Sequence, residues 1–538
     1  MNQNSSGSAN DMAAGPQVTQ RASQRMQNLS NHRGQAPHSV GLLMLAIVTL
    51  SGALQVRYGY YDPVAICWLA VTCSVTAWML LQLFARPWFL LLSLMTLVAV
   101  LLGPFPWNQA FYQSRAASPY AWWLWVPLAI LPVLTMCMIP WEKVRWKWPA
   151  QAGLLAIIGI NLILLCLTRL GFSEYVTVAW PGQESWIVLA LSCITILAVG
   201  LAFSRLAIRQ VLFLIILIVQ FYLGIWMLHL APRPYIDTWL WGQKAAVALL
   251  HGRNPYTITI PDISAPNAGN YPPDLIRHGR VMAGYVYPPL SLLTSTAGYL
   301  FGGDFRYAEL AMLSVSALLL ALMTDMSREG LLGAVMILFL PQAFFVITQG
   351  WIEPCVLFNV MILLFLAYRK PGWLGVGFGL FLVSKQYVFL SAPLVIMLWP
   401  RPISKSFMIR FGIQALVTGC IINLPFLLWN PHAMLNSIVP RHMYRFSSLS
   451  LASDWAHQTG HWPPAALWWG SVGLVNVLCL LRLPRRPWAF AFGTGTVYLT
   501  FFAGASEAFY NYYFLIICLF CVALTLLLQE RNVPEFAA

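Results

Sequence analysis

Apolar residues gather along the chain in runs of about 17–22 residues, the length that lets an α-helix cross the hydrocarbon core of a bilayer. Seven such runs occupy the first part of the chain, at residues 40–56, 63–84, 88–104, 121–139, 152–168, 186–204 and 210–231. The long polar stretch 232–286 follows them. The pattern therefore predicts seven membrane crossings before residue 232.

The basic residues predict the orientation of these runs, because cytoplasmic loops of membrane proteins hold an excess of Lys and Arg. With the N-terminus inside, residues 232–286 lie outside, and the basic clusters of this half lie in cytoplasmic loops: Arg86, Lys143–Lys147 and Arg205–Arg209. The same rule predicts spans in the second half near 307–325, 331–348, 354–368, 407–429, 465–481, 488–503 and 512–528. It also requires that run 288–302 does not cross, so this run should lie at the outer surface or re-enter the membrane.

Segment 373–399 must leave the cytoplasmic side and return to it, although it is too short for two full spans. We therefore expect two half-helices that turn near Ser384–Lys385–Gln386 at a cavity reached from outside, since irregular backbone at membrane depth needs such cover. The expected fold class is an all-α polytopic membrane protein of about sixteen membrane helices, with outer-face loops and juxtamembrane helices.

The composition agrees with this pattern. Of the 538 residues, 59% are hydrophobic and 9% are Asp, Glu, Lys or Arg, whereas a soluble domain carries about 25% charged residues. A large soluble enzyme, a nucleic-acid-binding protein and a disordered scaffold are excluded. The net charge of +14 fits basic cytoplasmic loops. The 10 cysteines lie mostly inside apolar runs and indicate neither a disulfide framework nor a zinc site.

Four polar stretches share the outer side in this topology, and function is expected where they converge: residues 232–286, 349–353, 430–464 and 504–511. Asp237 directly follows the end of an apolar helix and precedes the helical spacing of residues 238–251. Two interpretations stay open for Asp237. It is an N-cap that accepts free N–H groups, or it is a catalytic carboxylate, and both roles can coexist.

Two charged residues near apolar segments are further candidates. Lys385 lies within an apolar hairpin, where a charge is costly and marks a functional site by default. It either binds an anionic group or extends toward lipid headgroups. Glu353 begins a helix, so it is either an acid favoured by the helix dipole or a second acidic group that orients a substrate.

The outer stretch 430–464 carries positive charge on the side where positive charge is disfavoured, which predicts an anionic ligand. Arg441 and Arg445 are four residues apart, so a helix would place them on one face, where they could clamp a phosphate. The histidines of this stretch, with His442 among them, are metal ligands, proton-handling groups or solvated loop residues.

Several short motifs follow one another in order between residues 211 and 528. They are Asp237, Ala245-x-x-x-Leu249-Leu250-x-Gly252-x-Asn254-Pro255-Tyr256, Tyr287-Pro288-Pro289-Leu290, Gln349-Gly350, Gly375-x-Gly377-x-Gly379 leading to Lys385, and Phe509-Tyr510-Asn511-Tyr512-Tyr513. The ordered set resembles the GT-C membrane glycosyltransferases, and most nearly glycosyltransferase family 87, the polyprenyl-phosphate-mannose-dependent mannosyltransferases. The resemblance implies a GT-C-type helical bundle.

The first part of the chain departs from the usual family pattern, because the six helices before residue 210 have no counterpart in the family core. The expected organisation is a disordered cytoplasmic leader at 1–38, rich in Asn, Gln, Ser and Gly, followed by two membrane parts. These are a six-helix N-terminal extension at 39–209 and a catalytic core at 210–530.

The first outer loop also departs from the family pattern. An insertion at 257–284 carries a second copy of the motif, Tyr271-Pro272-Pro273, and Tyr287 is preferred as the family position because an apolar run follows it. No Asp-x-Asp occurs in this loop, so no metal or other cofactor is indicated, although a divalent metal stays open.

The resemblance implies transfer of a hexose, mannose by preference, from a polyprenyl-phosphate-sugar donor to a lipid-linked or cell-envelope glycan, with inversion. Such a transfer needs a base for the acceptor hydroxyl and cations for the departing phosphate, which needs no general acid. Asp237 would be the base, and the donor phosphate would be held by Lys385, Arg441 and Arg445. The remaining candidates would contact the acceptor or support these groups: Glu353, His442, Tyr287, Gln349 and Asn511.

The expected location is the plasma (inner) membrane, with both termini cytoplasmic and the active site outward. The implied partners are the lipid-linked donor, the glycolipid or glycan acceptor and membrane lipids, with no nucleic acid. Two alternatives stay open. Broken helices and buried charge are also features of transporters and lipid flippases, and a non-catalytic membrane partner could retain the same fold.

Overall fold

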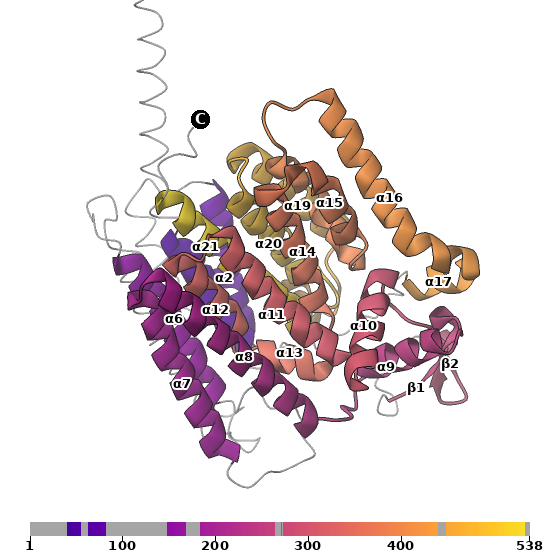
Figure 1. The fold of residues 1–538 in the computed structure, drawn as a ribbon. Helices are drawn as coiled ribbons and strands as arrows, with labels where there is room; N and C mark the ends of the chain where they lie inside the picture. The colour runs from indigo at the N-terminus through magenta and orange to yellow at the C-terminus, as the bar shows by residue number, and fades with distance from the viewer. Residues whose placement is uncertain are drawn as a thin grey trace, which may run out of the picture.

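The computed structural model describes residues 40–54, 63–81, 148–167, 183–263, 271, 273–438 and 448–532. Figure 1 shows a bundle of helices with α6 and α7 on one flank and α16 on the other. The leader at 1–38 and the expected spans at 88–104 and 121–139 lie outside the described residues. The coarse fold class, a predominantly helical protein with several helices apolar enough to cross a membrane, is confirmed.

The helices of the first half form where the apolar runs predict them. They are a helix at Val40–Leu54, α2 (Pro63–Leu81), α6 (Trp148–Leu167), α7 (Gln183–Phe203) and α8 (Leu206–Leu230). The runs predicted at 40–56, 63–84, 152–168, 186–204 and 210–231 are therefore helical as expected, with small differences at the ends.

The second half contains long helices separated by shorter ones. The long helices are α11 (Arg306–Met323), α14 (Glu353–Arg369), α16 (Lys405–Trp429), α19 (Ala465–Arg482), α20 (Pro487–Gly504) and α21 (Tyr510–Asn532). The shorter ones are α9 (Asp237–Leu250), α10 (Pro289–Gly302), α12 (Arg328–Leu338), α13 (Ala343–Gln349), α17 (Pro431–Ile438) and α18 (Leu451–Thr459), with 3₁₀ turns η2 (Pro255–Thr257), η3 (Pro273–Leu275) and η4 (Pro371–Trp373).

The helices of the N-terminal extension pack directly on the core helices. α6 and α7 contact α12, and α2 contacts α18, α19 and α20. Two buried polar contacts join the same parts: Gln151 donates to Glu329 Oε1 at 3.1 Å, and Gln342 donates to Ser51 Oγ at 2.9 Å. α21 lies in the middle of this arrangement and contacts α12, α14 and α20, so its apolar surface is almost wholly buried.

Six helices of the described residues are long and apolar enough to cross a membrane: α7, α8, α11, α16, α19 and α21. The pair α12 and α13 passes the same test together, with a bend of 44° between the two helices, and makes a seventh candidate. The larger number expected from the sequence, about sixteen, stays a prediction, because the described residues leave parts of the chain out and several of its helices are short.

The span expected at 331–348 is bent, and its crossing of the membrane stays a prediction. The chain leaves the helical conformation at Phe339 and returns to it at Ala343. Pro341 lies in this gap, and proline both lacks an N–H group and disfavours helical backbone at the preceding residue. The break separates α12 from the short helix α13. The residue after α13, Gly350, caps the helix with a positive φ of 70°.

The two half-helices predicted within 373–399 are confirmed. α15 (Leu374–Leu382) and the 3₁₀ helix η5 (Gln386–Leu398) are separated by a break, and Lys385 in this break is extended, with φ −159° and ψ 158°. Their re-entrant path through a membrane stays a prediction. The break places Lys385 where the backbone is no longer part of a helix.

α10 is the helix that the sequence predicts not to cross the membrane. It has 14 residues, which is about 21 Å of helix and too short for a hydrocarbon core of about 30 Å. It packs against α9 and α11. This length agrees with the expectation that run 288–302 does not cross.

The insertion at 257–284 adds a feature that the all-α expectation lacks. It holds a small antiparallel sheet of order β1–β3–β2, formed by β1 (Ile260–Pro261), β2 (Ile276–Arg277) and β3 (Arg280–Val281). β2 and β3 are joined by His278 and Gly279, whose φ angles of 50° and 69° are both positive, as a two-residue type I′ turn requires.

Charged residues of the core helices lie at two opposite ends of the bundle. Arg369 at the end of α14 pairs with Asp325, which follows the end of α11. At the starts of the same two helices, Glu309 Oε2 accepts the N–H of Cys355 at 3.1 Å, two residues after Glu353. α11 and α14 therefore run side by side in one direction, with the Arg369–Asp325 pair at one end and Glu309 and Glu353 at the other.

This separation predicts which parts of the chain face opposite sides of the membrane. An epitope tag inserted between His278 and Gly279, in the exposed hairpin, is expected to bind antibody on intact cells. A tag added after residue 538 is expected to bind antibody only after permeabilisation. Accessibility of both tags in the same state of the cells would contradict the topology.

Candidate functional site

A buried ion pair lies at the break between α15 and η5. The Lys385 ammonium group bonds Glu353 Oε1, and the two side chains are 4% and 0% exposed. Glu353 is the first residue of α14, where the helix dipole favours a carboxylate. Sequence reasoning treats the two residues as separate candidates, and the structure brings them together. Lys385 therefore does not extend to the surface, since its charge is matched inside the protein.

Three tyrosine rings surround the ammonium group. Nζ of Lys385 lies 5.1 Å from the ring centre of Tyr287, 5.4 Å from that of Tyr387 and 4.9 Å from that of Tyr512. These distances allow cation–π interactions, which compensate part of the hydration that the lysine loses. The Tyr387 hydroxyl also donates to Glu353 Oε1 at 3.4 Å. We call these three rings the tyrosine cage.

The loop that carries Tyr287 is held by hydrogen bonds from two directions. Gln386 Nε2, next to Lys385 in the chain, donates to Val286 O at 2.5 Å. The Tyr256 hydroxyl donates to Tyr287 O at 3.0 Å. The backbone of Gly284 lies so close to Tyr256 that a Cβ atom at position 284 would be 2.1 Å from Tyr256 O. Tyr256 thus positions the loop, and only glycine fits at residue 284.

Asp237 begins α9 and is half-buried. Its Oδ1 accepts the N–H of Thr238 at 2.8 Å, and its Oδ2 accepts the hydroxyl of Tyr271 at 2.6 Å. The N-cap position is occupied by Ile236, so the interpretation of Asp237 as the N-cap is wrong. The carboxylate lies instead in the first turn, where the helix dipole favours negative charge.

Tyr287 connects Asp237 to the ion pair. Burial raises the pKa of the Tyr287 hydroxyl well above its usual value, and Tyr512 and the carboxylates of Glu353 and Asp237 raise it further. Tyr287 therefore stays a neutral hydroxyl near two acids, while its ring contacts Lys385. Thr238, next to Asp237, bonds the carbonyl of Gln349, four residues before Glu353, so Asp237 and Lys385 lie at the same end of the bundle.

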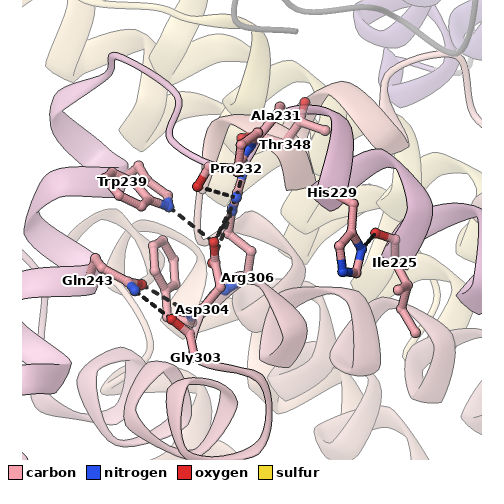
Figure 2. Close-up of polar contacts among 11 residues, drawn as sticks. Ile225, His229, Ala231, Pro232, Trp239, Gln243, Gly303, Asp304, Arg306 and Thr348 are labelled. Carbon is pink, nitrogen blue, oxygen red and sulfur yellow. Dashed lines mark hydrogen bonds and ion pairs between the residues drawn. The ribbon is translucent and has the colours of Figure 1, made fainter. Parts of the chain in front are cut away.

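A buried arginine holds α9 against the core. The Arg306 guanidinium is fully buried, pairs with Asp304 Oδ2 at 2.7 Å, and donates to the carbonyls of Thr348 at 2.8 Å and Ala231 at 2.9 Å. Trp239 Nε1 on α9 donates to the same Asp304 carboxylate at 3.3 Å. Figure 2 shows how these bonds converge on Arg306 and Asp304. The ends of α8 and α13 and the starts of α9 and α11 are thereby fixed to one another.

Two further contacts fix α9. Thr238 Oγ1 donates to the backbone carbonyl of Gln349 at 3.0 Å. Gln243 donates to Gly303 O at 2.6 Å and accepts the N–H of Phe305 at 3.3 Å (Figure 2). The buried residue Gln349, a candidate from the sequence, therefore contributes its backbone to the position of the first turn of α9.

The other candidates from the sequence divide into two groups. Asn511 precedes Tyr512 of the tyrosine cage, is 3% exposed, and its Oδ1 accepts no hydrogen bond from the described residues. Arg441, His442 and Arg445 lie outside the described residues, so their roles stay predictions. Within the described part of the chain, no group of three His, Cys, Asp or Glu side chains could hold a metal ion.

Sequence reasoning missed several residues of this region. Tyr271 belongs to the motif copy that was set aside in favour of Tyr287, and the structure places it on Asp237. Arg306 and Glu309 are fully buried charges at the start of an apolar run. A charge in an apolar segment is costly, and this signal, which marks Lys385, also marks Arg306 and Glu309.

Comparisons with models of protein families, with curated proteins and with solved structures find no match to this chain.

The buried ion pair predicts a mutational pattern that an exposed pair does not share. Lys385→Met leaves Glu353 buried without a partner, and we expect a loss of about 3–5 kcal/mol in the free energy of unfolding. Lys385→Met combined with Glu353→Gln removes both charges and is expected to recover most of this loss. Denaturant unfolding of the purified protein measures both effects.

The control is the Arg369–Asp325 pair, whose side chains are 41% and 73% exposed. Arg369→Met is expected to cost less than about 1 kcal/mol, because water screens and replaces an exposed ion pair. Equal losses for Lys385→Met and Arg369→Met, or a double variant at Lys385 and Glu353 that is less stable than Lys385→Met, would contradict the buried pairing.

Proposed function

We propose that the protein is an integral-membrane glycosyltransferase of the GT-C type. It transfers a hexose, mannose by preference, from a polyprenyl-phosphate-sugar to a lipid-linked or cell-envelope glycan on the outer face of the plasma membrane. The observation that carries the proposal is that Thr238, next to Asp237, donates to the Gln349 carbonyl four residues before Glu353, the residue that pairs with Lys385. This placement supports one site with a half-buried carboxylate and a buried cation. The motif order in the sequence supports the same function.

Asp237 suits the role of the base. Its Oδ2 already accepts a hydrogen bond from a hydroxyl group, that of Tyr271, and an acceptor hydroxyl would bind in the same way. As the acceptor oxygen bonds to the anomeric carbon, its proton passes to the Asp237 carboxylate. The bond from the anomeric carbon to the phosphate oxygen breaks with its electron pair. Polyprenyl phosphate then leaves as an anion that needs no proton.

Lys385 suits the role of the phosphate-binding cation. Glu353 is its partner in the structure, and a phosphate group offers more negative charge than one carboxylate. On donor binding the ammonium group exchanges Glu353 for the phosphate, and Glu353 becomes available to the acceptor. Arg441 and Arg445 are proposed as further phosphate contacts, and His442, Gln349 and Asn511 as groups on the acceptor side.

Replacing the base tests the proposal. Asp237→Asn keeps the shape of the side chain and cannot take a proton, so transfer from a labelled polyprenyl-phosphate-hexose is expected to fall by about 10²–10⁴-fold. The unfolding temperature is expected to stay unchanged. Asp274→Asn is the matched control, because Asp274 is exposed in the same outer loop, and it is expected to keep full activity. Wild-type turnover by Asp237→Asn would remove the base assignment.

A transporter or lipid flippase is the second candidate, and one observation favours it. The buried Lys385–Glu353 pair lies beside two short, broken helices, as ion and substrate sites of secondary transporters do. Purified protein in liposomes separates the two functions. A glycosyltransferase releases polyprenyl phosphate from a labelled donor, whereas a flippase moves the intact donor lipid to the other leaflet.

A further inference from the structure

Glu309 is a buried acid that the proposed reaction does not use. It lies in the first turn of α11, is fully buried, and its Oε2 accepts the N–H of Cys355 at 3.1 Å. Its other oxygen, Oε1, accepts no hydrogen bond from the described residues. Because Cys355 follows Glu353 by two residues, Glu309 and Glu353 both lie at the N-terminus of α14.

The charges of this cluster do not balance. Glu309 and Glu353 are two acids, and Lys385 is the cation that pairs with Glu353 and whose charge also reaches Glu309. All three side chains are at most 4% exposed. With both acids ionised, the cluster would carry a net charge of −1 in the interior, which costs several kcal/mol. The N-termini of α11 and α14 each add a partial positive charge of about half a unit, which lowers this cost but gives the Glu309 carboxylate no cation of its own.

Apart from Glu353 and Lys385, the titratable groups that face Glu309 are neutral. They are the Cys355 thiol on α14 and the Tyr285 hydroxyl in the loop before α10. Burial raises the pKa of Tyr285, so its hydroxyl keeps its proton. On α10 itself, the fully buried Ser295 hydroxyl lies within hydrogen-bonding reach of the Tyr285 hydroxyl.

The remaining charges on the helices around Glu309 are engaged elsewhere. Arg306, three residues earlier on α11, is paired with Asp304. Arg328 and Glu329 begin α12, which follows the far end of α11. The excess negative charge therefore has to be neutralised by something that the protein binds.

We propose that Glu309, Glu353 and Lys385 form a proton-binding site, which holds one proton in addition to the ion pair. The proton resides on Glu309 while Lys385 is paired with Glu353, so the cluster is neutral. Protonated Glu309 gains an O–H donor, and the buried hydroxyl groups of the facing helix α10, Ser295 among them, are acceptors of the kind that this donor needs.

The site couples anion binding to proton uptake. When an anion draws Lys385 away from Glu353, Glu353 becomes a second buried acid without a partner and takes up a proton of its own. Binding of a polyprenyl phosphate is therefore expected to strengthen as the pH falls, by up to about tenfold per pH unit for one proton taken up. This consequence rests on the proposed function, whereas the proton-binding site does not.

Infrared spectroscopy of the full-length protein in lipid nanodiscs tests the site. A protonated carboxyl group has a carbonyl band that a carboxylate lacks and that shifts in D₂O, and we expect this band in the wild type at pH 7. The band is expected to disappear in Glu309→Gln, where a neutral ion pair remains. It is also expected to disappear in Glu353→Gln, where Lys385 is free to pair with Glu309. In Lys385→Met both acids become protonated, and the band is expected to grow about twofold.

The matched control is Glu329→Gln. Glu329 is also buried, but its charge lies near those of Arg209 and Arg328, and the band is expected to persist in this variant. A wild type without the band, or a band that survives both acid substitutions, would overturn the proposal. A band that appears only when Na⁺ and K⁺ are withdrawn would also overturn it, because a metal cation would then be the occupant.

The infrared measurement does not depend on transfer activity, so its result is independent of whether the Asp237→Asn variant is active. Circular dichroism of each variant checks that the helices are retained. If Lys385→Met proves too unstable to purify, the two acid substitutions, Glu309→Gln and Glu353→Gln, decide the question.

Discussion

An ammonium group that loses its water must be compensated by the protein, and the candidate site is arranged around this requirement at Lys385. Glu353 supplies the opposite charge, and the tyrosine cage supplies π faces. The break between α15 and η5 allows Lys385 an extended backbone, and the neighbouring side chain of Gln386 holds the loop of Tyr287. The helix break, the loop and the cage are therefore consequences of burying one charge.

A second buried cation explains why the outer helix α9 has a fixed position. Arg306 binds carbonyl groups at the C-terminal ends of α8 and α13, where helix dipoles favour positive charge, and its planar guanidinium reaches several acceptors at once. Asp304 neutralises it and accepts the indole N–H of Trp239. Lys385 meets a carboxylate at a helix N-terminus, whereas Arg306 meets carbonyls at helix C-termini. Arg306 and Asp304 thereby hold α9, the helix that begins with Asp237.

The sequence predicts features that depend on local chemistry. The apolar runs predict the helices, and the short length of segment 373–399 predicts two half-helices. The cost of burying a charge predicts Lys385 as a site residue. It does not predict features that arise when distant segments meet: the pairing of Lys385 with Glu353 and the contact of Tyr271 with Asp237 depend on tertiary packing. The bend at Pro341 is different, because a local signal was present and the continuous apolar run concealed it.

The two candidate functions share their first physical step and differ in the second. A phosphate in the site of either an enzyme or a flippase must draw Lys385 away from Glu353, so the ion pair alone does not separate them. Asp237 does, because it lies outside the tyrosine cage and is held in a defined position by Thr238 and Tyr271. A carrier that moves an intact lipid does not require a carboxylate in a fixed position. A transferase requires one base at a constant distance from the phosphate. The ion pair of Arg306 with Asp304, and the hydrogen bond from Trp239 to Asp304, hold α9 in a fixed position and therefore favour the enzyme.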